Sequence, residues 1–366
     1  MIKVPFVDLA AQSAEIKKEV FEKWDKVIAS GDFILGRQTL NFEKKFAKFC
    51  QTKFCKLVGS GTDALYLSLI VAGVKPGDEV ITTSFSFVST ASTIVRLGAI
   101  PVFVDINSET FNLDPDKIEE KITKKTKAII PVHLFGQIAQ MPKIASIAKK
   151  YKLKVIEDAA QAHGATFAGQ PTGNFGDLAA FSFYLTKNLP SFSDCGAAVT
   201  NNKEYAKRIG ILANHGFTKP YIAQELGINS RADEFQAAWL TSCLKLLPKR
   251  NKKRQSLAQR YFEKLSRLPL TLPKISPSAE HVFHVFAVRT KKRGALKKFL
   301  AIKGIETQIY YPVPIHKQPA FAKFSKAKLP ETEKAASEIL ALPIYPQMTF
   351  SQQNYVCHTI HEYFKT

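Results

Sequence analysis

Two short apolar runs that end in polar residues carry the side chains that could do chemistry. The first run ends in Ile156-Glu-Asp158-Ala-Ala-Gln161, and the second ends in Ser182-Phe-Tyr-Leu-Thr-Lys187. Each pattern indicates a buried strand that stops at a site, and in an α/β protein such strand ends line the ligand crevice. We therefore expect an acid, Asp158, and an amine, Lys187, to face one pocket.

That pairing is what pyridoxal phosphate needs. A lysine amine binds the cofactor covalently, and a carboxylate keeps the ring nitrogen protonated so that the ring accepts electrons. A simpler interpretation stays open at this point. A lysine after an apolar run is commonly a solvated strand end, and Asp158 could cap the helix that begins near Ala159.

The elements that must position these residues alternate between β-rich runs and helical patterns from Phe54 to about Val199. Strands are expected at residues 55–58, 79–82, 100–104, 128–132, 154–156, 178–183 and 197–200, and helices at 63–71, 91–97, 141–150 and 203–213. This alternation predicts an α/β fold with a mostly parallel central sheet flanked by helices. Pro131 weakens the strand that contains it.

Helical spacing also predicts helices on either side of this segment. They are expected at residues 11–30, at 40–49 and at 233–247, with a further long helix that begins in the basic run 248–254. Shorter patterns at 260–265, 281–288, 295–302, 306–311 and 335–340 indicate a smaller α+β unit. We expect a large domain over residues 1–248, with residues 1–30 packing on it, and a small C-terminal domain over residues 249–366.

The formal net charge of +21 arises from 52 Lys and Arg against 31 Asp and Glu. Basic clusters at 121–127, 149–154, 249–254 and 291–298 could attract nucleic acid or an anionic membrane. They are scattered, however, and lack both interleaved aromatics and a recognisable nucleic-acid-binding motif. We expect no nucleic-acid partner and no membrane partner, and a basic surface that steers a diphosphate-bearing substrate.

Five cysteines, at positions 50, 55, 195, 243 and 357, form no close CxxC pair. We therefore expect buried or inert thiols rather than a disulfide framework or a structural zinc site, and no metal. The apolar runs are too short for a membrane span, and the start Met1-Ile-Lys-Val-Pro5 lacks the apolar region of a secretory signal. A cytoplasmic location is expected.

A glycine-rich turn, Gly59-Ser-Gly-Thr62, follows the first expected strand and opens a helix. Glycines let the backbone approach a ligand closely, and the N-terminus of a helix favours an anion. Such a turn is weak evidence alone. Placed before Asp158 and Lys187, it fits a phosphate-binding site.

The chain resembles the DegT/DnrJ/StrS family of nucleotide-sugar aminotransferases, which use pyridoxal phosphate on the fold of aspartate aminotransferase (fold type I). The resemblance runs nearly end to end. It rests on motifs in family order, namely Pro5–Leu9, Gly31–Gly36, Gly59–Leu65, Pro76–Val80, Glu157–Gly164, Ser182–Lys187, Gly227–Arg231 and Tyr311–His316.

The resemblance implies roles for residues in the cofactor site. Gly61, Thr62 and Ser182 match residues that bind the cofactor phosphate, and Phe87 matches an aromatic that stacks on the ring. Asp158 would face the ring nitrogen and Gln161 the ring hydroxyl. Lys187 would hold the cofactor and, once displaced, move a proton. His163 is expected to be a packed residue outside the catalytic set.

The resemblance also implies partners and a substrate region. Asn229 matches a residue that reaches across a homodimer to the phosphate in the neighbouring subunit, so active sites would be shared. Arg231 could bind a carboxylate of the amino donor or of a uronic acid, or form a surface ion pair. Tyr311 and His316 match residues near the sugar.

Lys187 stands where similar sugar dehydratases have histidine, which favours transamination over deoxygenation. The expected reaction moves an amino group from glutamate, through the pyridoxamine phosphate form, onto a nucleotide-linked ketosugar. The start of the chain and Thr62-Asp-Ala-Leu65 favour C3 of a dTDP- or UDP-linked sugar. The alternatives are amination at C4, or a pyridoxal phosphate-binding regulator that has lost turnover. Products of such enzymes enter lipopolysaccharide O-antigen, other surface polysaccharides or glycosylated metabolites.

Two stretches depart from the family pattern. Where the family has a glycine-rich loop ending Gly-Asp-Gly-Gly-Ala, this chain has Leu189-Pro-Ser-Phe-Ser-Asp-Cys-Gly-Ala197. Proline fixes φ and cysteine tolerates positive φ poorly, so the loop must follow another path or be strained. Tyr310 replaces a frequent histidine before Tyr-Pro, which weakens any transfer of substrate identity.

Overall fold

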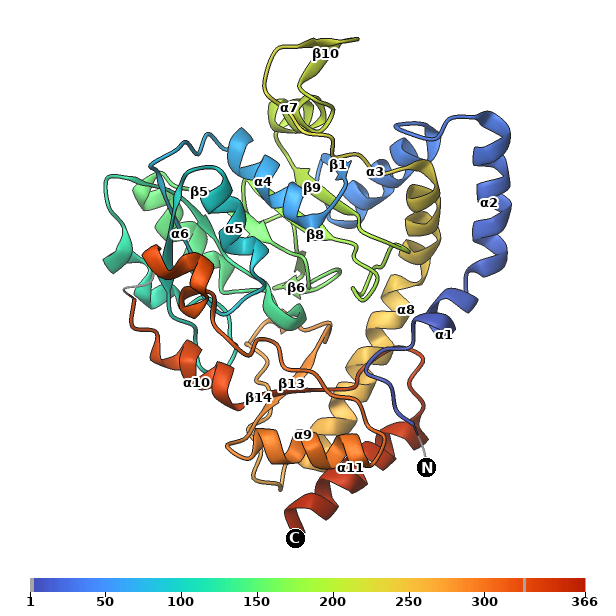
Figure 1. The fold of residues 1–366 in the computed structure, drawn as a ribbon, viewed down its shortest axis with the longest axis vertical. Coiled ribbons are helices and arrows are strands. Elements are labelled where there is room, and N and C mark those ends of the chain that lie inside the picture. Colours follow the sequence, from blue (N-terminus) through green and yellow to red (C-terminus); the bar gives the residue numbers. More distant parts are fainter. Residues whose placement is uncertain (1–2, 325–326, 366) are drawn as a thin grey trace.

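A seven-stranded sheet forms the centre of the computed structural model, which describes residues 3–324 and 327–365 (Figure 1). Residues 1–2 of the expected N-terminal segment and residue 366 lie outside the described residues. In spatial order the strands are β1 (Phe54–Val58), β9 (Gly196–Thr200), β8 (Leu178–Ser182), β5 (Lys154–Asp158), β4 (Thr126–Ile130), β2 (Glu79–Thr83) and β3 (Ile100–Val104). Strand β9 runs in the direction opposite to the other six strands, which all point the same way, so the expected mostly parallel sheet is confirmed.

The two faces of the sheet bury different clusters because successive residues of a strand point to opposite sides. Leu178 and Ala180 of β8 pack in the cluster that includes α4 (Gly61–Val71) and α7 (Lys203–Ala213). Ala179 and Phe181 pack in the cluster that includes α3 (Arg37–Phe49) and the first half of α8 (Glu234–Leu265). Helices α5 (Ser89–Arg96) and α6 (Met141–Tyr151) complete the flanking layers.

The strand expected at residues 128–132 corresponds to β4, which ends at Ile130, one residue before Pro131. The Pro131 carbonyl nonetheless accepts the backbone N–H of Asp158 at 2.9 Å, and the His133 N–H donates to the carbonyl of Asp158 at 3.0 Å. A proline lacks an N–H but keeps its carbonyl, so the pairing with β5 continues past the strand end.

Helix α8 is one helix of 32 residues, whereas the sequence predicted two helices separated at Pro248. Leu247, just before the proline, is buried in the cluster against the central sheet. Leu257, beyond it, is buried in a second cluster formed with the C-terminal elements (Figure 1). Packing on both sides outweighs the hydrogen bond that a proline removes from the helix interior, so the separation was wrong.

The C-terminal region is α+β, as expected. It contains β13 (Phe286–Arg289), α9 (Arg293–Ile302), α10 (Pro330–Glu338), β14 (Ile339–Leu342) and α11 (Phe350–Lys365), and β13 pairs with β14. The sequence did not predict α11, whose buried face includes Val356 and Ile360. We keep a division near residue 248 as a proposal, because α8 crosses it unbroken.

The start of the chain contacts both regions. Val4 pairs with Ile305 and is buried in the C-terminal cluster. After α1 (Leu9–Ala14), α2 (Lys17–Ser30) packs on the first half of α8, where Trp24 stacks on Trp239. Gly31 ends α2 with φ of 72°, the left-handed conformation that glycine adopts without strain. Short strands form two further sheets. One contains β12 (Ala279–Glu280), β6 (Thr166–Phe167) and β7 (Gln170–Pro171), and in the other β10 (Phe217–Lys219) pairs with β11 (Ile222–Ala223).

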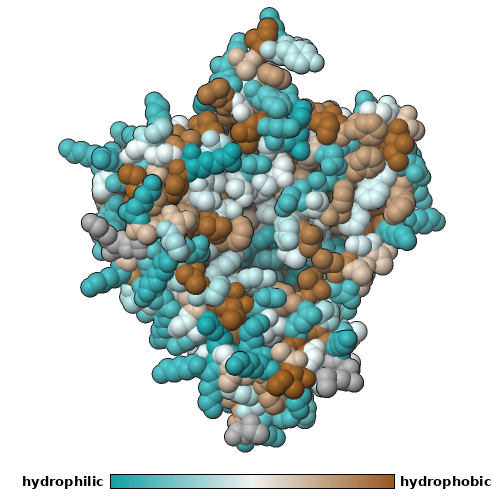
Figure 2. All heavy atoms as spheres, viewed as in Figure 1, coloured by the Kyte–Doolittle hydropathy of each residue, from teal (hydrophilic) through white to brown (hydrophobic). Residues whose placement is uncertain are grey.

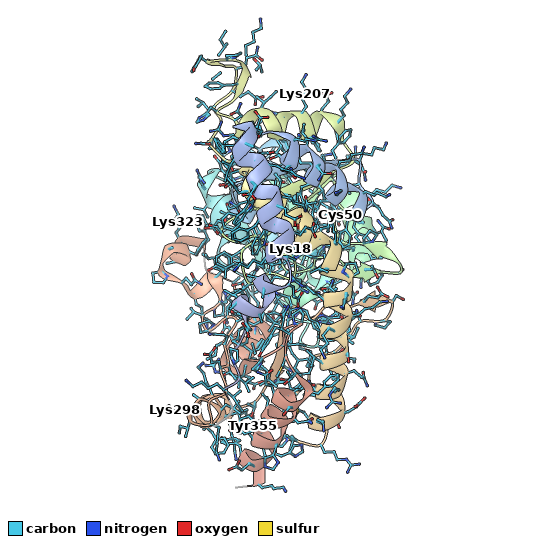
Figure 3. All side chains as sticks on the ribbon, turned by 90° about the vertical axis from the view of Figure 1, so that its right-hand side faces the viewer. Lys18, Cys50, Lys207, Lys298, Lys323 and Tyr355 are labelled. Atoms are coloured by element: carbon cyan, nitrogen blue, oxygen red, sulfur yellow. The ribbon has the colours of Figure 1, made fainter. Side chains whose placement is uncertain are left out.

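Charge is spread over the surface rather than gathered on one element. The exposed Lys18, Lys207, Lys298 and Lys323 in Figure 3 come from α2, α7, α9 and the 3₁₀ segment Pro319–Phe324. All five cysteines are buried free thiols, as expected. Across residues 3–324 and 327–365, no helix combines the length and apolar character that a bilayer crossing requires.

Candidate active site

A cavity of about 790 Å³ lies at the carboxyl ends of β5 and β8. The face in Figure 2 is hollowed near its centre, between the sheet and the C-terminal elements. Of the residues expected from the sequence, the cavity brings together Gly61, Thr62, Phe87, Asp158, Gln161, Ser182, Lys187 and Tyr311. Residues from five separate stretches of chain thus converge on one space.

Asp158 is the last residue of β5, and its carboxylate is buried. The Thr90 hydroxyl donates to Oδ2 at 2.7 Å, and the Ala160 backbone N–H donates to Oδ1 at 3.3 Å. Burial raises the pKa of Asp158, while these donors and the nearby charge of Lys187 oppose that rise. The two oxygens retain acceptor capacity toward the cavity, where a protonated ring nitrogen would satisfy it.

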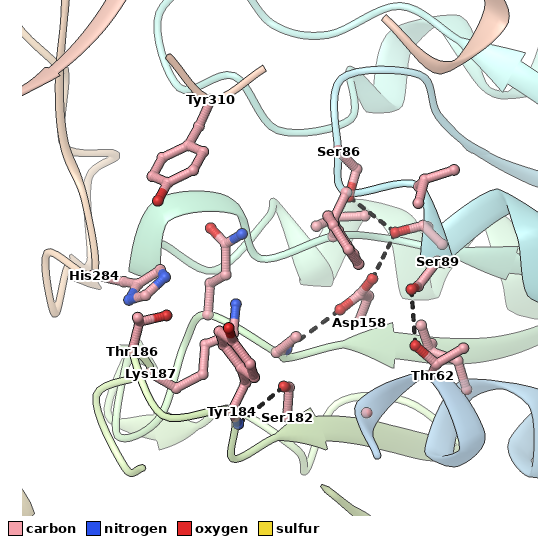
Figure 4. Close-up of a pocket in the computed structure, with 18 of the residues that line it drawn as sticks. Thr62, Ser86, Ser89, Asp158, Ser182, Tyr184, Thr186, Lys187, His284 and Tyr310 are labelled. Atoms are coloured by element: carbon pink, nitrogen blue, oxygen red, sulfur yellow. Dashed lines mark hydrogen bonds between the residues drawn. The ribbon is translucent and has the colours of Figure 1, made fainter. Parts of the chain in front are cut away.

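Lys187 follows β8 in a tight turn whose backbone N–H donates to the Tyr184 carbonyl at 2.8 Å. Its side chain and that of Asp158 point into the same cavity (Figure 4). Burial lowers the pKa of Lys187 to about 8, and the charge of Asp158 opposes the shift. A lysine with such a pKa is partly neutral near pH 7 to 8, which suits an amine that attacks a carbonyl and moves protons.

The N-terminus of α4 forms one wall. The Ser60 hydroxyl caps it by accepting the Asp63 N–H at 3.0 Å. A Cβ on Gly61 would lie 2.7 Å from Cβ of Ser182, and one on Gly196 would lie 2.4 Å from the Ser60 carbonyl. Glycine is required at both positions because α4 and the ends of β8 and β9 approach so closely. The wall presents free N–H groups to an anion.

Gln161 holds two sides of the cavity together. Its Oε1 accepts the Phe135 N–H at 2.8 Å, and its Nε2 donates to the Tyr311 hydroxyl at 3.0 Å. Phe87 stands at the opening with 56% of its surface exposed, and its ring centroid lies 6.4 Å from that of Tyr311. A flat apolar face exposed at a cavity is suited to stacking on a ligand ring.

Three of the expected residues lie outside the cavity. Asn229 is exposed, and Arg231 donates to the side-chain oxygens of Asn229 and Asn214, each at 3.0 Å. The hydrogen bonds of Arg231 thus go to amide oxygens, and its binding of a substrate carboxylate stays a prediction. His316 is buried, and its Nδ1 lies 2.7 Å from the Ser84 hydroxyl, below the cavity wall.

His163 packs beneath the site, as expected. Its ring lies 5.4 Å from that of Phe181 and 5.7 Å from that of Phe183. Burial, together with the positive charge of Lys187, lowers the pKa of His163 to about 3. His163 is therefore a neutral packing residue that supports the end of β8 and does not line the cavity.

In the loop that departs from the family pattern, neither Pro190 nor Cys195 has a positive φ. The Pro190 carbonyl accepts the indole N–H of Trp239 at 3.1 Å, and the Ser191 N–H donates to the Phe183 carbonyl at 2.6 Å. Cys195 is buried, with its thiol 3.6 Å from the Val58 carbonyl. The loop is thus anchored by backbone contacts, and the strain considered above is absent.

Several lining residues escaped the sequence reasoning. Thr90 and Ser89 come from the start of α5, where Ser89 lies 2.8 Å from the Thr62 hydroxyl. His284 comes from the C-terminal region, where residues 281–288 were expected only as an element of the α+β unit and not as part of a site. Four further lining residues, Tyr184, Thr186, Asp194 and Tyr310, stand within stretches that the sequence analysis had already singled out, around Lys187 and Tyr311.

The donor set fits pyridoxal phosphate. One wall offers N–H groups and hydroxyls for a phosphate, the opening offers an aromatic face, and the two ends offer a buried amine and a buried carboxylate with acceptor capacity. Gly61, Thr62 and Ser182 would hold the phosphate, Phe87 the ring face, and Asp158 and Lys187 the ring nitrogen and the aldehyde carbon. Bound there, the cofactor supplies an electron-accepting ring.

Comparison with known proteins gives a consistent result. The model of the DegT/DnrJ/EryC1/StrS aminotransferase family matches residues 14–361. A Geobacillus stearothermophilus protein named pleiotropic regulatory protein is 44% identical over 100% of this chain and 99% of its own length. An Aneurinibacillus thermoaerophilus dTDP-3-amino-3,6-dideoxy-alpha-D-galactopyranose transaminase is 42% identical over 98% of this chain and 99% of its own length.

Solved structures agree with the fold. S. venezuelae DesV, crystallised with a bound intermediate, is 39% identical with a TM-score of 0.98, covering 100% of both chains. A Bacillus subtilis protein with bound cofactor PMP is 36% identical with a TM-score of 0.94, covering 100% of this chain and 86% of that one. The expected fold type I and the expected cofactor, pyridoxal phosphate, are confirmed.

Proposed function

The chain belongs to the DegT/DnrJ/EryC1/StrS aminotransferase family, and from that premise we propose that it transfers an amino group from glutamate to a nucleotide-linked ketosugar. The observation that carries the chemistry is that Lys187 and Asp158 face one buried cavity. In this proposal Lys187 binds the cofactor and then, as a free amine, moves a proton at the substrate carbon. Asp158 keeps the ring nitrogen protonated.

We propose C3 of a dTDP- or UDP-linked 3-ketosugar as the acceptor carbon, with C4 as the alternative. The name of the Aneurinibacillus relative, a transaminase of a dTDP-3-amino sugar, supports C3. Tyr310 stands at the cavity, where the family often has histidine, so the sugar contacts differ from those of many relatives. Surface polysaccharide is the destination proposed for the product.

We further propose a homodimer in which the partner completes each active site. Lys187 is the single cationic side chain among the described residues that line the cavity, if neutral His284 is set aside. A nucleoside diphosphate and glutamate both carry negative charge, so further cations must come from elsewhere. Exposed apolar residues on α2, on the start of α3 and on the loop between them are suited to a partner: Phe21, Ile28, Phe33, Ile34, Leu35 and Leu40.

The test loads the purified protein with pyridoxal phosphate and follows its visible absorption. Glutamate should bleach the band, and the resulting protein should aminate 3-keto sugars of dTDP or UDP faster than 4-keto sugars, with the product identified by mass spectrometry. Faster amination of 4-keto sugars would reverse the choice of carbon. A band that glutamate and other amino donors leave unchanged would favour a regulator, a role that the name of the Geobacillus relative makes worth testing.

A further inference from the structure

A chain of buried amides leads from the cavity to α8, and it begins at His284. His284 lines the cavity on the side where Thr186 and Lys187 enter it (Figure 4). Its Nδ1 lies 3.3 Å from Oδ1 of Asn188, the residue directly after Lys187. Asn188 in turn donates to Oδ1 of Asn251 on α8 at 3.0 Å, and both amides are buried.

Two backbone carbonyls fix the hydrogen-bonding roles along this chain. Nδ2 of Asn251 donates to the His163 carbonyl at 2.8 Å, and Nδ2 of Asn188 donates to the Val282 carbonyl at 3.1 Å. A carbonyl only accepts, so each amide must present its nitrogen there and its oxygen elsewhere. Asn188 Oδ1 is therefore an acceptor, and the proton of His284 must stand on Nδ1. Its Nε2 is left as a bare acceptor.

The imidazole is neutral and its direction is fixed. Burial, and after it the positive charge of Lys187, holds the pKa of His284 well below its usual value. The preceding residue, Phe283, has φ of 45°, a conformation that aromatic residues rarely adopt. Phe283 stacks on His281 at a centroid distance of 4.0 Å, and this packing holds the turn that delivers His284 to the cavity.

We propose that His284 is a positioning residue for Lys187. Both side chains line the cavity, and the ammonium of the lysine turns to donate a hydrogen bond to the bare Nε2 once it is displaced from the cofactor, a contact that the structure does not itself contain. The amine then stays inside the cavity, ready to return its proton, instead of turning toward solvent. Asn188 ties both groups to α8. The catalytic consequence rests on the aminotransferase function proposed above, whereas the tautomer of His284 follows from its contact with Asn188 and can be measured without turnover.

Other titratable groups face this pair and must be separated from it. In the cavity they are Asp158, Tyr184, Asp194, Tyr310 and Tyr311, and behind it they are His163, Arg254 and His281. Substitutions at His284 leave all of them in place. A difference between the wild type and a His284 variant therefore reports on the imidazole.

The first experiment measures the tautomer of His284 by NMR of the cofactor-free protein labelled with ¹⁵N-histidine, with His284→Gln used to assign the signal. The expected result is a protonated Nδ1 and a bare Nε2 at pH 7. A protonated Nε2, or a doubly protonated ring, would overturn the proposal. This measurement requires neither a sugar substrate nor an amino donor.

The second experiment uses pyridoxal phosphate itself as the probe of Lys187. The amine attacks the aldehyde only when neutral and loses water on forming the covalent link, so the pH dependence of the uptake rate reports the pKa of Lys187. His284→Phe removes the acceptor and should lower that pKa by about one unit. His284→Gln, whose amide oxygen accepts, should restore most of the shift.

A matched control is Gln255→Ala. Gln255 lies one turn beyond Asn251 on α8 and donates to the His281 carbonyl at 3.2 Å, outside the amide chain. Its uptake profile should match the wild type. An unshifted profile in folded His284→Phe would overturn the proposal, and should that variant not fold, the wild-type tautomer decides alone.

In glutamate turnover, His284→Phe should lower kcat about tenfold with KM nearly unchanged. Failure of turnover in the wild type would reject the aminotransferase proposal and leave the tautomer result intact.

Discussion

Two carboxylates end β5 side by side, and their surroundings differ. Glu157 points to one face of the sheet, where four donors fill it: the His133 imidazole at 2.9 Å and the backbone N–H groups of Gly173, Phe175 and Gly176 at 2.8 to 3.0 Å. Asp158 points to the other face, accepts from Thr90 and Ala160, and looks into the cavity. Burial alone therefore does not mark a functional acid. Unused acceptor capacity beside a cavity does.

The largest effect is expected from the amine that faces Asp158. Lys187→Ala removes the covalent anchor and the proton carrier together, so the visible band should vanish and amination should fall by at least about a thousandfold. Spectra and turnover with glutamate measure both. Retention of a glutamate-sensitive band in the variant would remove Lys187 from the centre of the mechanism.

Substitution of the two neighbouring acids should affect different properties: Asp158→Asn should lower activity, whereas Glu157→Gln should lower folding stability. Asp158→Asn should lower kcat by about a hundredfold, because a neutral amide does not hold the ring nitrogen protonated. The folding stability of the cofactor-free protein should change by less than about 1 kcal/mol, since burial already disfavours the charged form. Turnover and denaturant unfolding measure these effects. A large loss of both kcat and folding stability in Asp158→Asn would contradict the assignment of Asp158 as a catalytic rather than a structural acid.

Glu157→Gln should lower the free energy of unfolding by about 3 to 4 kcal/mol, because its amide nitrogen would face donors that the carboxylate now satisfies. Protein that remains folded should retain most of its kcat. Denaturant unfolding beside Asp158→Asn gives the matched comparison. Equal stability of the two variants would show that the number of hydrogen-bond donors to each carboxylate does not distinguish the two acids.

A pH titration sharpens the comparison from the side of the amine. The folded-state pKa of Lys187 is about 8, below its ordinary 10.5, so the unfolded chain binds more protons between these values. Stability of the cofactor-free wild type should therefore rise with pH from about 8 to 10.5, by about 2 to 3 kcal/mol relative to Lys187→Met. Parallel stability curves for the two proteins across this window would contradict a desolvated amine.

The smallest effect concerns the wall opposite Asp158. Gly61→Ala places a Cβ 2.7 Å from that of Ser182, so it should cost about 1 to 2 kcal/mol and weaken cofactor binding. Gly294→Ala in α9 is the control, because nothing lies within 4 Å of its Cβ and alanine favours a helix. Thermal melting and cofactor titration compare them. Equal cofactor affinity in both would argue against a close-packed phosphate wall.

Local pattern was sufficient where strands and helices are short and regular. Ile100–Val104 and Lys203–Ala213 have the predicted bounds, and Gly31 ends α2 as predicted. Lys187 and Asp158 could be paired because adjacent strands of a parallel sheet end at one edge. Such inferences depend on spacing within one element, which the sequence displays directly.

The features that the sequence did not predict depend on packing between residues far apart in the chain. Pro248 was treated as a helix boundary, yet the two cores on either side hold α8 together across it. Thr90 and His284 join the cavity from distant stretches, and no local motif marks either one. Arg231 and His316, chosen by resemblance, are engaged by other polar groups outside the cavity. Ser84, the partner of His316, lies far away in the sequence, whereas Asn229 is only two residues from Arg231.

The burial of Val4 against Ile305 has a consequence for how the chain is made. Val4 leaves the ribosome well before Ile305, and the cluster that receives it includes residues as late as Ile360. The central sheet can gather its layers once α8 has emerged, whereas the segment around Val4 must wait, with its apolar side chains uncovered, until the C-terminal cluster has been translated. During that interval the newborn amino end would be a natural client for holding chaperones.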